Sequence, residues 1–238
     1  MWDTLTKYNN LIITEDDQGW RWYGTAEQPF LYPSVTTILH ETIHQPGLIN
    51  WYKNNSANAI DKRLAETGAV GTELHKIFDA DIHGVGIDVP PSLSQHSINF
   101  REWMLKHEVK PVKTEFVIVS ERYGYAGRVD FFGEVGGKME VVDWKTGNIF
   151  GDTWGDQVAA YQMAICEMLQ VPDTEIGMRI LQVARDDAKL TQFKYQHLDW
   201  MQDSFLLALE RFKRVPRFTK LKKMGWPYLM KKSMVRAT

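Results

Sequence analysis

One stretch, residues 124–161, constrains the fold more than any other part of this 238-residue chain. It holds two runs of alternating apolar residues, 126–135 and 139–144, with Gly136 and Gly137 between them. A glycine pair supplies the positive backbone angles of a tight hairpin turn. The pattern therefore predicts two antiparallel β-strands joined by that turn.

Three charged side chains interrupt these apolar strands. Asp130 lies in the middle of the first run, and Asp143 and Lys145 lie two positions apart in the second, on one face of a strand. Buried charges are costly unless they are paired or bound to a metal. In one interpretation Asp143 pairs with Lys145 and Asp130 caps a turn. In the other, the two carboxylates hold Mg²⁺ against a phosphate and the lysine positions or deprotonates an attacking water.

Three successive motifs carry a resemblance to a known family. They are GRVD at 127–130, VDWKTG at 142–147 and QVAAY at 157–161, the last on a helix expected to begin near Thr153. In type, order and spacing they resemble the motifs of RecB-type nucleases of the PD-(D/E)XK superfamily. Asp-Trp-Lys corresponds to (D/E)XK, and Gln-x-x-x-Tyr corresponds to the helix motif that follows it.

The resemblance implies an α/β fold with a restriction-endonuclease-like core, in which helices flank a mixed central sheet. It also implies a helical N-terminal elaboration. We expect a hairpin and helical region at 1–110, a nuclease core at 111–214 and a basic tail at 215–238.

Local patterns predict the remaining elements. We expect a hairpin in 8–32 and a helix that Ser34 caps. Further helices are expected at 48–59, 61–83, 92–106, 153–169 and 198–214, and strands at 112–120, 175–184 and 190–195. Strand 112–120 is expected to alternate regularly between two faces.

A metal site follows from the resemblance. Asp130 and Asp143 are expected to hold Mg²⁺ or Mn²⁺ with help from the Trp144 carbonyl. His75 joins them because Gly71-Thr72-x-x-His75 resembles the helix motif that precedes the nuclease core, where the histidine reaches the metal.

Other residues are expected to support the reaction. Lys145 is expected to orient the water, while Gln157 and Tyr161 fix either the lysine or the DNA strand. Gln157 and Tyr161 are also compatible with plain packing. Glu115 has two interpretations that stay open, a supporting position behind the metal site and an ordinary surface charge.

The implied activity is hydrolysis of phosphodiester bonds by a divalent-metal-dependent DNA nuclease. The chain is most similar to single-strand exonucleases of mitochondrial and bacteriophage origin that lack an iron–sulfur cluster. This favours action on single-stranded DNA ends, in DNA repair or recombination. Three alternatives stay open: a flap or junction endonuclease, a non-catalytic DNA-binding accessory protein of recombination, and an enzyme acting on another phosphodiester.

Cysteine content and apolar patterning limit which cofactors the chain can bind and where in the cell we expect it. Cys166 is the only cysteine, so the chain can form no intrachain disulfide and cannot supply the four cysteines of an iron–sulfur cluster. No apolar run reaches bilayer length, and the first residues lack the features of a signal peptide. We expect no membrane partner and a cytoplasmic location in a bacterial or phage-infected cell. A mitochondrial location also stays open, although no transit peptide is visible.

Charge is distributed unevenly along the chain. Residues 211–238 contain ten Lys or Arg and no acidic residue, whereas 1–210 contain 18 basic and 30 acidic residues. Such a segment is either a solvated terminus or a contact for nucleic-acid phosphates. With the nuclease motifs present we favour the contact. The expected DNA-binding residues are Arg217, Lys220, Lys222 and Lys223, with Trp154 stacking on a base.

Overall fold

The computed structural model describes residues 2–17, 19–43, 54–146, 153–183, 190–216 and 218. Its centre is a five-stranded sheet in which only the β6–β7 pair is parallel. The strands, in sheet order, are β4 (Lys110–Ser120), β5 (Tyr125–Val135), β6 (Lys138–Lys145), β7 (Gly177–Val183) and β8 (Leu190–Tyr195). The predicted α/β fold with a mixed central sheet is confirmed.

The β5–β6 hairpin forms as the glycine pair predicts. Gly136 and Gly137 have φ angles of 60° and 76°, and Val135 pairs with Lys138 across the turn. Both angles lie in the left-handed region, which glycine enters without steric cost. The turn fixes the register of the two strands that carry Asp130 and Asp143.

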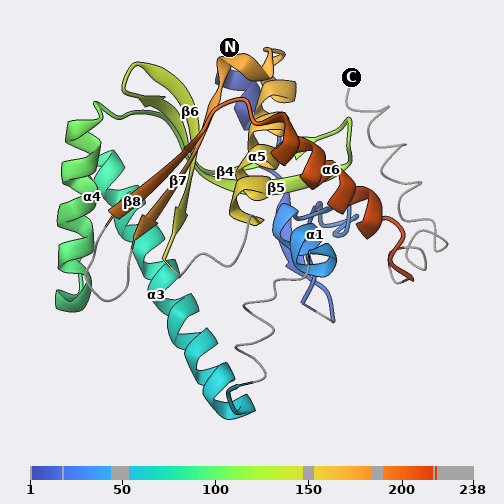
Figure 1. The fold of residues 1–238 in the computed structure, drawn as a ribbon, viewed down its shortest axis with the longest axis horizontal. Coiled ribbons are helices and arrows are strands. Elements are labelled where there is room, and N and C mark those ends of the chain that lie inside the picture. Colours follow the sequence, from blue (N-terminus) through green and yellow to red (C-terminus); the bar gives the residue numbers. More distant parts are fainter. Residues whose placement is uncertain are drawn as a thin grey trace.

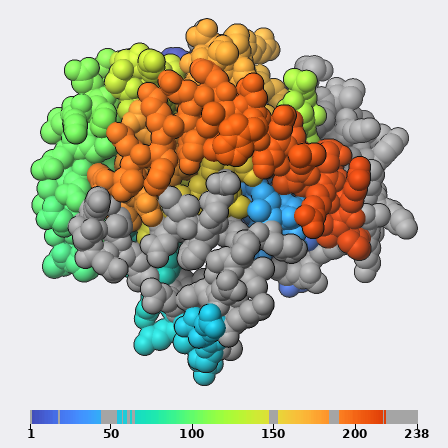
Figure 2. All heavy atoms as spheres, viewed as in Figure 1, coloured from blue at the N-terminus to red at the C-terminus, as the bar shows by residue number. Residues whose placement is uncertain are grey.

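Helices cover both faces of the sheet (Figure 1). One side carries α3 (Ala57–His83) and α4 (Ser94–Lys106), with the 3₁₀-helix η2 (Pro91–Leu93) leading into α4. The other side carries α1 (Val35–Thr42), α5 (Thr153–Leu169) and α6 (Asp199–Phe212). Because β6 and β7 are parallel, α5 is the crossover that connects them. In Figure 2 the first turns of α3, in cyan, project beyond the rest of the molecule.

Two hydrophobic clusters hold these layers together. The larger one joins the N-terminal elements to β4, β5, α5 and α6, with Trp22, Ile118 and Phe205 fully buried. The smaller one joins α3 and α4 to the other face of the sheet, where Phe78 stacks on Phe100.

The N-terminal part contains the predicted hairpin. After the 3₁₀-helix η1 (Trp2–Thr6), β1 (Ile12–Glu15) pairs with β2 (Arg21–Gly24), which pairs with β3 (Tyr32–Pro33). The Ser34 side chain then accepts a hydrogen bond from the Thr37 N–H at 3.0 Å. This is the helix cap that the sequence predicts.

Some predicted elements differ from the structure. The first half of the helix expected at 48–59 lies outside the described residues. Its second half is wrong in part, because 54–56 are not helical and Ser56 caps α3 instead. The strand expected from 175 begins at Gly177, because the short 3₁₀-helix η3 (Asp173–Glu175) precedes it.

Regular alternation along 112–120 is also wrong. The register of β4 against β5 shifts between Pro111 and Lys113, and Glu115 has a left-handed φ of 47°. Within the described residues, no helix combines the length and the apolar character needed to span a bilayer.

Candidate active site

The site is built around Asp130 on β5, which is only 7% exposed. One carboxylate oxygen, Oδ2, accepts a hydrogen bond from the Trp144 N–H on β6 at 2.7 Å. The other, Oδ1, lies 3.3 Å from His75 Nδ1 on α3. Phe131 pairs with Val142, so Asp130 and Asp143 are the next opposed positions of the two strands. The hairpin register therefore brings the two predicted carboxylates together.

Asp130 belongs to a cluster of side chains of the types that can bind a metal ion. Among the described residues, His75, Glu115 and Asp130 form the one group of at least three such side chains whose ligand atoms all lie within 4.8 Å of each other. Glu115 Oε1 lies 3.3 Å from His75 Nδ1, and Glu115 Oε2 lies 2.7 Å from Arg128 Nε. Glu115 thus touches His75 directly, and Arg128, which has no role assigned from sequence, holds its second oxygen.

The electrostatics of this cluster favour positive charge. Burial lowers the pKa of His75, but the neighbouring Asp130 and Glu115 carboxylates outweigh burial and raise this pKa to about 10. Two carboxylates that stabilise an imidazolium would equally stabilise a cation bound between them.

Asp143 and Lys145 form the adjoining half of the site with two residues of α5. Lys145 Nζ lies 2.6 Å from Asp143 Oδ2 and donates to Gln157 Oε1 at 2.9 Å. The Gln157 amide donates to Asp143 Oδ1 at 2.9 Å and to the Tyr161 hydroxyl at 2.8 Å. Burial raises the pKa of Asp143, and Lys145 only partly offsets this rise. Four of the five residues expected to be catalytic from sequence thus form one contact network, and the fifth, Asp130, accepts from the backbone of Trp144 between Asp143 and Lys145.

Glycines of the sequence motifs make room for these contacts. A Cβ atom on Gly127 would lie 2.5 Å from Cε1 of Tyr161, so any other residue here would push the ring away from β5. A Cβ atom on Gly71 would lie 3.2 Å from Oγ1 of Thr146, which immediately follows the Asp-Trp-Lys motif.

The donor set fits a divalent cation. Ligands about 2.1 Å from Mg²⁺ lie about 3–4.2 Å from one another in an octahedron. The two distances of 3.3 Å from His75 Nδ1 to the Glu115 and Asp130 carboxylates fall in this range. Asp143 Oδ2 is buried, and its close neighbour is the Lys145 ammonium at 2.6 Å. Oxygen-rich ligands with one imidazole suit Mg²⁺ or Mn²⁺.

The remaining predicted residues have different positions. The Trp144 ring packs between the aromatic rings of α3 and α4, so only its backbone faces Asp130. Metal binding by its carbonyl stays a prediction.

Lys145 Nζ lies 5.9 Å from the centre of the Trp154 ring, which places Trp154 beside the site. The predicted tail contacts Arg217, Lys220, Lys222 and Lys223 lie outside the described residues.

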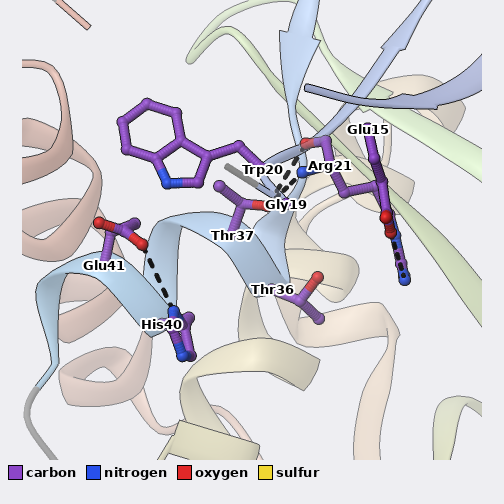
Figure 3. Close-up of a pocket in the computed structure, with 8 residues that line it drawn as sticks. All are labelled: Glu15, Gly19, Trp20, Arg21, Thr36, Thr37, His40 and Glu41. Atoms are coloured by element: carbon purple, nitrogen blue, oxygen red, sulfur yellow. Dashed lines mark hydrogen bonds and ion pairs between the residues drawn. The ribbon is translucent and has the colours of Figure 1, made fainter. Parts of the chain in front are cut away.

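A cavity elsewhere contains none of the predicted site residues. Its volume is about 310 Å³, and it lies between the β1–β2 hairpin and α1 (Figure 3). Its charged side chains pair with each other, Arg21 with Glu15 and His40 with Glu41. The cluster at His75, Glu115 and Asp130 is therefore the stronger candidate for the chemistry.

Comparison with known families agrees with this geometry. No curated protein matches the chain. The family model of the PD-(D/E)XK nuclease superfamily matches residues 92–215, slightly more than half of the chain. The matched part runs from α4 through β8 and α6 and includes every residue of the Asp143 network. The chain belongs to the PD-(D/E)XK nuclease superfamily.

Proposed function

We propose that the protein is a Mg²⁺- or Mn²⁺-dependent deoxyribonuclease that removes nucleotides from the ends of single-stranded DNA. The observation that carries the proposal is that two groups of residues lie next to each other on opposed positions of β5 and β6. The cation-attracting cluster of His75, Glu115 and Asp130 adjoins the Asp143–Lys145 pair at one edge of the β5–β6 hairpin.

His75, Glu115, Asp130 and Asp143 are the residues that would hold the cation. When bound, a divalent cation at such a site stabilises charge on the phosphate and lowers the pKa of water. Glu115, expected from sequence to lie behind the site or on the surface, is here proposed as a direct ligand because its Oε1 faces His75.

The residues of the Asp143 network have separate roles. Lys145 orients the attacking water and offsets negative charge on the phosphate, since its side chain is only 19% exposed and its ammonium is held on two sides. Gln157 fixes both Lys145 and Asp143 through its amide group, and the Tyr161 hydroxyl fixes Gln157. Supporting hydrogen bonds of this kind set the geometry that catalysis needs.

Substitutions in both halves of the site test the mechanism. We expect Asp130→Ala, Asp143→Asn and Lys145→Ala each to lower Mg²⁺-dependent release of label from single-stranded DNA by at least about a hundredfold. Circular dichroism should show that the variants remain folded. Glu73→Ala is the matched control, because Glu73 also lies on α3 but pairs with Lys76 near the surface. Full activity in Lys145→Ala would contradict the mechanism.

The requirement for a DNA end is tested with linear and circular single strands of the same sequence. An enzyme that needs an end degrades the linear DNA and leaves the circle intact. Labels at the 5′ or 3′ end then give the direction of digestion. Cleavage of the circle would instead support the structure-specific endonuclease, and metal-independent binding without cleavage would support the accessory protein.

A further inference from the structure

A second cavity of about 610 Å³ opens directly beside the metal-binding cluster. It lies between β1 and the first half of β4, and both Glu115 and Arg128 form part of its wall. Since Glu115 also contacts His75, the cavity and the cluster share a side chain. We call this cavity the β1–β4 groove.

Half of the residues that line the groove are apolar, and they come from both of its strands and the turn before β1. They are Leu11, Ile12, Ile13, Phe116 and Val117. Ile12 and Ile13 are 44% and 41% exposed on the four-residue strand β1. Exposed apolar surface next to a reaction site favours binding of an apolar part of the substrate there.

The groove also carries positive charge. Arg128 is half exposed, and its Nε contacts Glu115, which fixes the orientation of the guanidinium plane. Its Nη atoms make no ion pair with any residue that the structure describes. A guanidinium held in this way can donate two parallel hydrogen bonds to a phosphate.

We propose that the β1–β4 groove binds one unpaired nucleotide next to the cleaved bond. Its base lies against Ile12 and Ile13, and Arg128 binds its phosphate. This inference rests on the proposed function and names the part of the DNA that the site recognises. The volume lies in the range of about 300–1,000 Å³ that is usual for small-molecule sites. A base in a duplex is stacked and paired, so only an unpaired or extruded base can enter.

The test combines groove variants with abasic substrates. The double variant Ile12→Gln/Ile13→Gln replaces the two apolar side chains of β1 with polar ones of similar size. An abasic residue is placed at each successive position of a short single-stranded oligonucleotide, and KM and kcat are measured with Mg²⁺. The matched control is Ile98→Gln/Leu105→Gln, two exposed apolar residues of α4 that do not line the groove.

We expect the wild type to show one position where loss of the base raises KM about tenfold. The double variant should show this higher KM with intact DNA and no further rise with the abasic substrate. The control variant should behave as the wild type does. If the double variant is poorly folded, Ile12→Gln alone provides the same comparison.

Two failures can be told apart. A wild type that degrades no DNA with Mg²⁺ or Mn²⁺ refutes the proposed function itself. An active wild type refutes the groove alone if the Gln variants keep the wild-type KM, or if the abasic effect persists in full in those variants.

Discussion

At the scale of single residues, β6 shows why a buried charge is an ambiguous sign of function. Glu140 and Asp143 both interrupt the same apolar strand and are 0% and 3% exposed. Glu140 accepts two hydrogen bonds from Arg179 on β7, at 2.6 and 2.9 Å, and is therefore satisfied within the fold. Asp143 is held instead by Lys145, two residues along the same strand, and by Gln157 of α5, and both partners belong to the candidate site. The sequence pattern is the same, and the difference lies in the partners that the fold supplies.

The Glu140–Arg179 pair should matter for stability and not for catalysis. We expect Arg179→Met to lower the free energy of unfolding by about 3–5 kcal/mol, because Glu140 would keep a buried charge without its main partner. The double variant Glu140→Met/Arg179→Met should recover most of this loss. Urea unfolding measures both values. Equal destabilisation of the single and double variants would show that the charge is not the cause.

At the scale of elements, the sequence predicts the parts of the site that lie on regular structure. Strands β5 and β6, their glycine turn and helix α5 agree with their predicted positions. Asp130, Asp143, Lys145, Gln157 and Tyr161 lie on these three elements, so strand and helix periodicity brings them together.

The same reasoning gives no account of how Glu115 and Arg128 are placed. Glu115 itself has a left-handed backbone conformation, which interrupts the regular alternation of β4. Its two partners, His75 and Arg128, lie on other elements, α3 and β5. Local periodicity cannot predict a backbone irregularity or a long-range contact of this kind. Arg128 had one available signal, its position inside the Gly-Arg-Val-Asp motif.

The contact between β5 and α5 depends on Gly127. We expect Gly127→Ala to lower the free energy of unfolding by about 1–3 kcal/mol, because the new methyl group would overlap the Tyr161 ring. A displaced ring would also release Gln157, so kcat should fall. Thermal unfolding and DNA degradation measure the two effects.

Gly86→Ala is the control for this substitution, since a Cβ atom there meets nothing within 4 Å. It should leave stability and activity close to those of the wild type. If Gly127→Ala proves equally harmless, Tyr161 does not pack against β5 as described.

At the scale of the whole molecule, both helical layers contribute to one reaction centre. His75 comes from α3, which packs on the smaller hydrophobic cluster, and Gln157 and Tyr161 come from α5 in the larger one. Their contacts meet at Asp130 and Asp143 in the sheet between them. The site therefore requires both faces of the sheet to be covered, and no single element can form it.

Charge separation along the chain gives a prediction for binding at this scale. Residues 1–210 have a formal charge of −12 and 211–238 of +10, so the basic segment is expected to supply much of the attraction to DNA. Deleting 217–238 removes seven Lys or Arg. For single-stranded DNA, each neutralised phosphate contributes about 0.7 to the slope of log K against log salt. The deletion should therefore weaken binding and flatten this slope.

Fluorescence anisotropy with a labelled oligonucleotide measures that slope, and Asp143→Asn in both proteins prevents degradation during the titration. A full-length variant with the same seven residues changed to Gln separates charge from chain length. If charge is responsible, it should match the deletion, with weaker binding at low salt and a flatter slope. An unchanged slope in both proteins would mean that the basic segment does not touch DNA. DNA binding would then depend on Arg128 and the residues of the candidate active site. In that case salt would change KM equally in the full-length protein and in the protein without residues 217–238.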